Sequence, residues 1–98
     1  MNQTHENELR AYSQNVVIDR LTSSRSAAEV TNELKGLSEV EQLEALQKAI
    51  YATEDEVEMY LSWNMPALAS SKTSLLTCLQ DTLALVRSTY TSSHANFN

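Results

Sequence analysis

The 98-residue sequence contains one glycine (Gly36), one proline (Pro66) and one cysteine (Cys78). Sheets of short strands need a turn about every 8–12 residues, and those turns draw on glycine and proline for their backbone angles. One residue of each kind is too few to form the turns of a β-sandwich or a β-barrel. A single glycine also excludes the phosphate-binding loops GxGxxG and GxxxxGK, because each of them needs more than one.

Basic residues are scarce as well, with 7 lysines and arginines against 13 acidic residues and a net charge of −6. A surface of this sign repels nucleic-acid phosphates and anionic lipids, so we expect no direct nucleic-acid binding and no membrane association. No apolar run approaches the roughly 18 residues of a membrane span, and the first residues lack a signal-peptide pattern. A lone cysteine cannot form an internal disulfide. We therefore expect a cytoplasmic protein, with export by a route that needs no such signal as the alternative.

The residues that are present favour helices. Apolar residues make up 42% and charged residues 20% of the chain, as in an ordinary globular domain. The sequence predicts an all-α fold, a small antiparallel bundle of about four helices, with a single helical domain over residues 1–90 and a disordered polar tail at 91–98. The helices are expected at residues 5–21, 27–35, 39–65 and 68–90 or 72–90. Because the apolar stripe of the first helix is irregular, a strand over Asn15–Leu21 is a minority alternative.

Three helix starts are indicated by a hydroxyl residue with a glutamate three positions later, the spacing of a capping box. They begin at Ser26, Ser38 and Thr53, and Gly36 is placed to close the helix that opens at Ser26. Thr53 leaves two alternatives, a third helix broken near residue 53 or one continuous helix. The apolar residues keep one helical phase across residue 53, which favours the continuous helix. These residues are Leu43, Leu46, Ile50, Val57, Tyr60 and Leu61.

The last helix has an arc of apolar and threonine side chains that spans about 180°, wider than the roughly 100° stripe of a surface helix. Such a helix is either central to the bundle or shared with another chain. We expect a homodimer, since a symmetric pair is the commonest oligomer. The candidate partner or dimer face consists of Leu75, Cys78, Leu79, Thr82, Leu85 and Val86.

Acidic residues are concentrated in the middle of the chain, where residues 37–66 hold seven acids and one base. One interpretation is a solvated helix face. The other is a docking surface for a basic protein partner, which the field of the acids would steer. The candidate acidic docking face consists of Glu54, Asp55, Glu56 and Glu58.

An aromatic and thioether cluster precedes Pro66 and contains Met59, Tyr60, Trp63 and Met65. Such clusters most often belong to a core, so burial is the favoured interpretation. If Trp63 and Tyr60 are exposed instead, they are the candidate hot spots of an interface.

No catalytic, cofactor-binding or metal-binding residue is predicted. Cys78 is interpreted as a buried small hydrophobe, and the two histidines, His5 and His94, lie near the ends. We expect a non-enzymatic protein–protein interaction module (an adaptor, inhibitor, chaperone or regulator) with a basic or helical partner. The alternatives are an acidic regulator or DNA mimic that binds a nucleic-acid-binding protein, and a small ligand-binding or catalytic bundle that uses carboxylates such as Glu41 or Glu44.

Overall fold

The computed structural model describes residues 15–94, and this part of the chain is helical apart from short links. Residues 15–22 are helical and are followed by α2 (Ala27–Leu34), α3 (Glu39–Ser62) and α4 (Pro66–His94). Residues 15–94 contain no strand, so the all-α prediction is confirmed and the strand alternative over Asn15–Leu21 is wrong. Residues 5–14 of the expected first helix lie outside the described residues.

Two of the three expected helix starts are confirmed. The Ser26 side chain accepts a hydrogen bond from the Glu29 backbone N–H, while the Glu29 carboxylate accepts from the backbone N–H of Arg25. Ser38 and Glu41 form the full reciprocal capping box at the start of α3. These side chains satisfy backbone donors that the first turn of a helix leaves unpaired, which is why both helices begin where they do.

Thr53 does not start a helix. Its side chain is fully buried, and its hydroxyl donates to the carbonyl oxygen of Ala49 one turn earlier at 2.7 Å. A threonine can make this bond inside a continuous helix, so the spacing to Glu56 does not signal a cap here. The prediction of one long helix is confirmed through residue 53, although α3 ends at Ser62 rather than at residue 65.

The link between α3 and α4 is short because two local signals meet there. Asn64 adopts a left-handed conformation (φ 58°), its N–H donates to the Leu61 carbonyl at 3.1 Å, and the Met65 N–H donates to the Tyr60 carbonyl at 2.8 Å. These two bonds form a Schellman motif, which terminates α3. Pro66 then occupies the first position of α4, where its missing N–H costs nothing. The expected start at residue 68 or 72 is therefore too late.

The last helix also ends later than expected. α4 continues to His94, so residues 91–94 of the expected disordered tail are helical, and residues 95–98 lie outside the described part. Gly36 has the positive φ (88°) that was predicted for the residue closing α2. None of the helices within residues 15–94 is long and apolar enough to cross a membrane.

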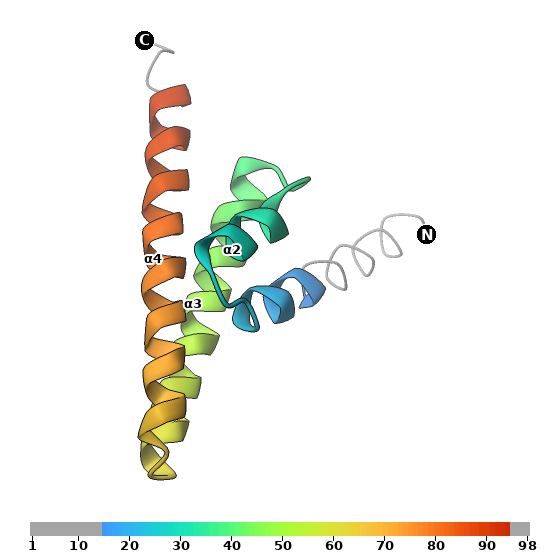
Figure 1. The fold of residues 1–98 in the computed structure, drawn as a ribbon. Coiled ribbons are helices and arrows are strands. Elements are labelled where there is room, and N and C mark those ends of the chain that lie inside the picture. Colours follow the sequence, from blue (N-terminus) through green and yellow to red (C-terminus); the bar gives the residue numbers. More distant parts are fainter. Residues whose placement is uncertain (1–14, 95–98) are drawn as a thin grey trace, which may run out of the picture.

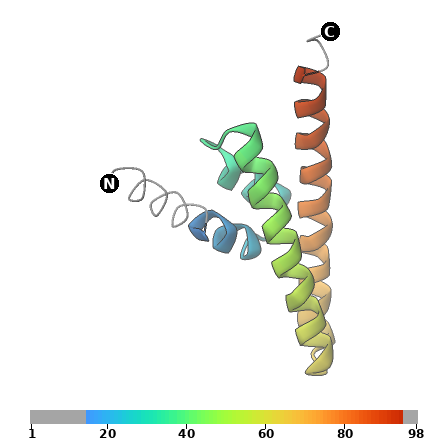
Figure 2. The same ribbon diagram turned by 180° about the vertical axis from the view of Figure 1, so that it is seen from behind.

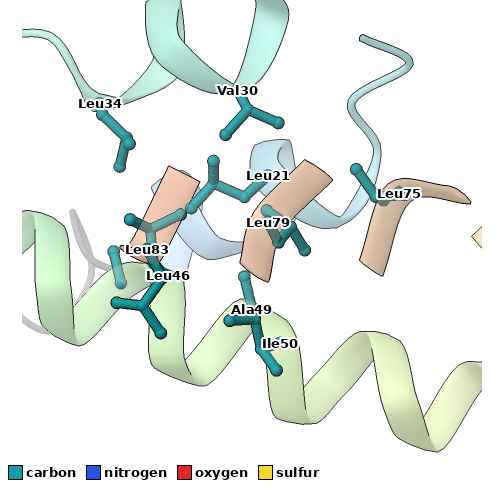
Figure 3. Packing of buried hydrophobic residues seen from close by; sticks show 10 residues of the cluster. Leu21, Val30, Leu34, Leu46, Ala49, Ile50, Leu75, Leu79 and Leu83 are labelled. Carbon is teal, nitrogen blue, oxygen red and sulfur yellow. The ribbon is translucent and has the colours of Figure 1, made fainter. Parts of the chain in front are cut away.

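α3 and α4 pack against each other from their link and diverge away from it, and the C-terminal end of α4 extends beyond α3, as both ribbon views show (Figures 1 and 2). α2 and the helical residues 15–22 lie on the diverging part of the pair (Figure 1). One core forms where the four segments meet, and Figure 3 shows its side chains pointing toward one another. Its members are Leu21, Val30, Leu34, Ala45, Leu46, Ala49, Ile50, Leu75, Leu79 and Leu83.

Polar contacts tie the N-terminal segment to this pair. Lys72 of α4 donates from Nζ to the carbonyl oxygen of Thr22 at 2.6 Å and lies 3.1 Å from a carboxylate oxygen of Glu56 on α3. The cation thereby satisfies a carbonyl in the last turn of the helix at 15–22, where the helix dipole favours positive charge. Gln42 of α3 donates its amide to the Leu37 carbonyl at 3.1 Å, beyond the end of α2. A single side chain, Lys72, thus joins three helical segments.

Candidate interaction surface

Large apolar side chains are exposed around the link between α3 and α4. We call this set the link surface, and it consists of Leu61, Trp63, Met65 and Leu68, which are 59%, 59%, 44% and 48% exposed. Residues 59–71, which include all four, contain no charged residue. Isolated apolar residues are common on protein surfaces, but several large ones within eight residues of the chain, with no charge among them, favour a binding site.

The geometry of the link places these side chains outward. Trp63 is the C-cap residue directly after α3, and its ring packs edge-on against that of Tyr60, with centroids 6.3 Å apart and planes inclined by 77°. Tyr60 is half-buried, whereas more than half of Trp63 is exposed. The interpretation of this cluster as core is therefore wrong for Trp63 and Met65. The helices end here, so no further turn of a neighbouring helix is available to cover them.

Sequence reasoning missed Leu61 and Leu68 as surface residues. Leu61 shares the helical phase of the buried residues and was expected to face inward. Its phase is at the edge of that stripe, and the segment that covers the stripe elsewhere does not extend to the link (Figure 1). The uncharged run at 59–71, centred on the turn at Pro66, is the sequence signal that could have identified this surface.

The candidate acidic docking face is divided by the fold. Glu54, Asp55 and Glu58 are exposed on α3. Glu56 points to the other side and forms the ion pair with Lys72, in which both side chains are more than two-thirds buried. Three of the four predicted acids thus form a solvent-facing group on the part of α3 next to the link surface. Glu56 does not belong to this group, because it pairs with Lys72.

The candidate dimer face is divided more strongly. Leu75 and Leu79 are core residues, and Val86 packs against the core, so these three are used within the chain. Cys78 and Thr82 are half-buried, and the Thr82 hydroxyl donates to the Cys78 carbonyl at 2.8 Å. Leu85 remains, and it is 68% exposed. The broad apolar arc of α4 is therefore explained mainly by its central position in the fold.

Cys78 lies on the wall of an open pocket between residues 23–25 and α4, together with Arg25, Ser71 and Ser74. The pocket has a volume of about 680 Å³. Cys78, which the sequence analysis interprets as a buried small hydrophobe, is half-buried. Among the described residues, no three histidine, cysteine, aspartate or glutamate side chains are grouped so as to hold a metal ion. His5 and the His94 side chain lie outside the described part.

Comparisons with protein-family models, with curated proteins and with solved structures found no match for this chain.

Proposed function

We propose that this protein is a non-enzymatic binding module that holds another protein against its link surface. The observation that supports the proposal is the exposure of Trp63 beside Leu61, Met65 and Leu68 in a region without charged residues. Tryptophan and tyrosine are the residues that most often dominate interface energies, because they bury a large area when a partner covers them.

The local structure makes this surface suitable for binding. The Schellman motif and Pro66 hold the backbone of the link, so little conformational entropy is lost when a partner docks. The edge-on contact with Tyr60 limits the orientations of the Trp63 ring in the same way. No ionic group of residues 59–71 has to be desolvated. A preorganised apolar site with an acidic neighbour favours a protein partner whose contact region is apolar with a basic margin.

The test is quantitative affinity capture from cells with three baits: the unmodified chain, Trp63→Ala and Val40→Ala. Val40 is a large apolar residue that is 48% exposed, but it lies in the first turn of α3, at the opposite end of that helix from the link, so Val40→Ala is the matched control. We expect a partner that is lost with Trp63→Ala and retained with Val40→Ala. Retention of every captured protein by Trp63→Ala would contradict the proposal.

A captured partner can then be examined in purified form, because Trp63 is the only tryptophan of the chain. Covering an exposed indole moves its fluorescence emission to shorter wavelength. A direct contact between the partner and Trp63 can therefore be detected without a label. A partner that binds with no change in Trp63 emission would show that the link surface is not the contact.

A second candidate function is supported by the three exposed acids Glu54, Asp55 and Glu58. An acidic regulator of a nucleic-acid-binding protein would present these carboxylates where that protein normally binds phosphates. Competition separates the two candidates. Added duplex DNA would displace the partner of a DNA mimic, but it would leave a partner held by Trp63 in place.

We also propose that this module acts in the cytoplasm, and the homodimer stays a prediction. Because Leu75 and Leu79 are used in the core, a dimer contact on α4 has to be centred on Leu85. We expect Leu85→Ser to lower the dimer fraction in analytical ultracentrifugation. A clean monomer of the unmodified chain at high micromolar concentration would exclude the dimer in that range.

A further inference from the structure

The solvent-facing side of α3 has a regular pattern that the link surface does not explain. Tyr51, Glu54, Glu58 and Leu61 follow one another at intervals of three, four and three residues, and we call them the outer seam. Residues at these intervals line up along one side of a helix. All four are exposed, Tyr51 and Leu61 by 59% each.

The outer seam has the spacing of a helix-packing stripe. Intervals of three and four residues are those of the contact positions in paired helices. Its two outer positions are a tyrosine and a leucine, and its two central positions are carboxylates. The Gln47 side-chain amide donates to the Tyr51 hydroxyl at 2.9 Å, which holds the tyrosine hydroxyl on this side of α3. The stripe is therefore ordered and has apolar ends with an anionic centre.

We propose that the outer seam binds an amphipathic helix of the partner protein that has arginine or lysine at its two central contact positions and apolar residues at its outer ones. This inference rests on the proposed function and names the chemistry of the partner. From Tyr51 to Leu61 the seam extends about 15 Å at the rise of an α-helix, so a partner helix of about three turns covers it. Leu61 belongs to both surfaces, which makes the seam continuous with the link surface.

Charge decides between this occupant and a second copy of the chain. Pairing two outer seams in either direction would bring Glu54 or Glu58 of one copy opposite a glutamate of the other. Like charges at facing contact positions are destabilising, and polar residues at such positions select the partner and the register. Cations at the facing positions would instead pair with both carboxylates, and their apolar neighbours would cover Tyr51 and Leu61. The seam thus favours a basic helix and disfavours self-association.

The experiment uses the full chain and three synthetic helical peptides of about five turns, measured by isothermal titration calorimetry. The first peptide has leucines at its outer contact positions and arginines at the two central ones. The second replaces these two arginines with glutamates. The third is a scramble of the first with identical composition. We expect the first peptide to bind, and the second and third to bind much more weakly. Equal binding of the first and the scramble would overturn the proposal.

Variants then locate the contact. Glu54→Gln with Glu58→Gln should weaken binding of the arginine peptide by about 2- to 30-fold, the range for two solvent-accessible ion pairs. The matched control is Asp19→Asn with Asp81→Asn, which removes the same charge from exposed positions outside α3. An equal loss in the control would show that only the overall field of the protein matters, and this would overturn the seam as a site.

A charge reversal gives the sharpest result. Glu54→Lys with Glu58→Lys should lose the arginine peptide and gain the glutamate peptide, with an unchanged circular dichroism spectrum. If the reversed protein does not change its preference, the proposed register is wrong.

The two proposals fail separately. A captured partner that depends on Trp63 but is insensitive to Glu54→Gln with Glu58→Gln would leave the proposed function intact and contradict the basic-helix occupant. If no captured protein depends on Trp63 while the arginine peptide binds the seam, the proposed function fails and the chemistry of the seam stands.

Discussion

Leucines of α3 and α4 have opposite surroundings at the two ends of the pair. Where the helices diverge, Leu46, Leu79 and Leu83 are buried, because Leu21 and the side chains of α2 fill the space between them (Figure 3). At the link, Leu61 and Leu68 are 59% and 48% exposed, because no third segment of the described chain covers them. The comparison shows that a two-helix pair buries its facing residues only in part, and that a further layer is needed to complete a core.

The largest expected effect is a core truncation. Leu79→Ala should lower the free energy of unfolding by about 2–5 kcal/mol, since a fully buried leucine leaves a cavity that neighbours fill only in part. The matched change at the other end, Leu68→Ala, should alter it by less than about 0.5 kcal/mol. Urea denaturation followed by circular dichroism measures both. Similar losses for the two leucines would refute the contrast between the two ends.

The next effect concerns the attachment of residues 15–22 to the pair. Lys72→Met should cost about 1–3 kcal/mol, because it leaves the Thr22 carbonyl and the Glu56 carboxylate without their cation. Lys35→Met is the control, since Lys35 is exposed. Hydrogen exchange should show that Lys72→Met lowers protection most in residues 15–22. A uniform loss of exchange protection over all helices would mean that residues 15–22 do not unfold separately from the rest.

A smaller effect is expected at the link. Asn64→Ala should cost about 1 kcal/mol, because a left-handed backbone is unfavourable for a residue with a Cβ and without the local hydrogen bonds of asparagine. Asn64→Gly should be neutral or slightly stabilising in the same urea denaturation assay. Gly36→Ala is a second test, and with nothing within 4 Å of an added Cβ, any loss there arises from backbone strain alone. A destabilising Asn64→Gly would contradict the assigned backbone conformation.

The smallest expected effect on stability comes from the proposed binding residues. Trp63→Ala should change the free energy of unfolding by less than about 1 kcal/mol, since more than half of the side chain is already exposed. Its effect on partner binding should be far larger, about 2 kcal/mol or more if Trp63 is a hot spot. Urea denaturation measures the change in stability and calorimetry measures the change in partner binding, both on the same preparation. A variant that unfolds easily would place Trp63 in the folding core instead of the interface.

Much of the fold could be predicted because helix boundaries depend on local chemistry. Ser38 and Glu41 form their capping box within four residues, and Gly36 supplies a positive φ through its own lack of a side chain. Thr53 shows the limit of this reasoning. Its spacing to Glu56 is that of a cap, but its full burial, its hydrogen bond to the Ala49 carbonyl and the pairing of Glu56 with Lys72 override the local signal.

The site was predicted less well, since exposure is not a local property. The candidate residues Trp63 and Leu85 are exposed, whereas Leu75, Leu79 and Glu56 are used within the chain. All of them belong to apolar or acidic patterns that are equally compatible with a core, an interface or solvent. The pattern around a residue does not show how far the neighbouring helix extends, or that Lys72 on the next helix contacts Glu56.

The sequence by itself determined that this chain forms helices and where α2 and α3 begin, because hydroxyl caps, carboxylates and glycine act on backbone groups a few bonds away. It also determined the acidic character of α3 and the turn at Pro66. Only the tertiary structure decided which leucines are covered, that Glu56 pairs with Lys72, and that Trp63 faces outward. A leucine of the α3 and α4 pair is buried only where a third segment of the chain packs over it. The periodicity of apolar residues along one helix does not show where that third segment lies.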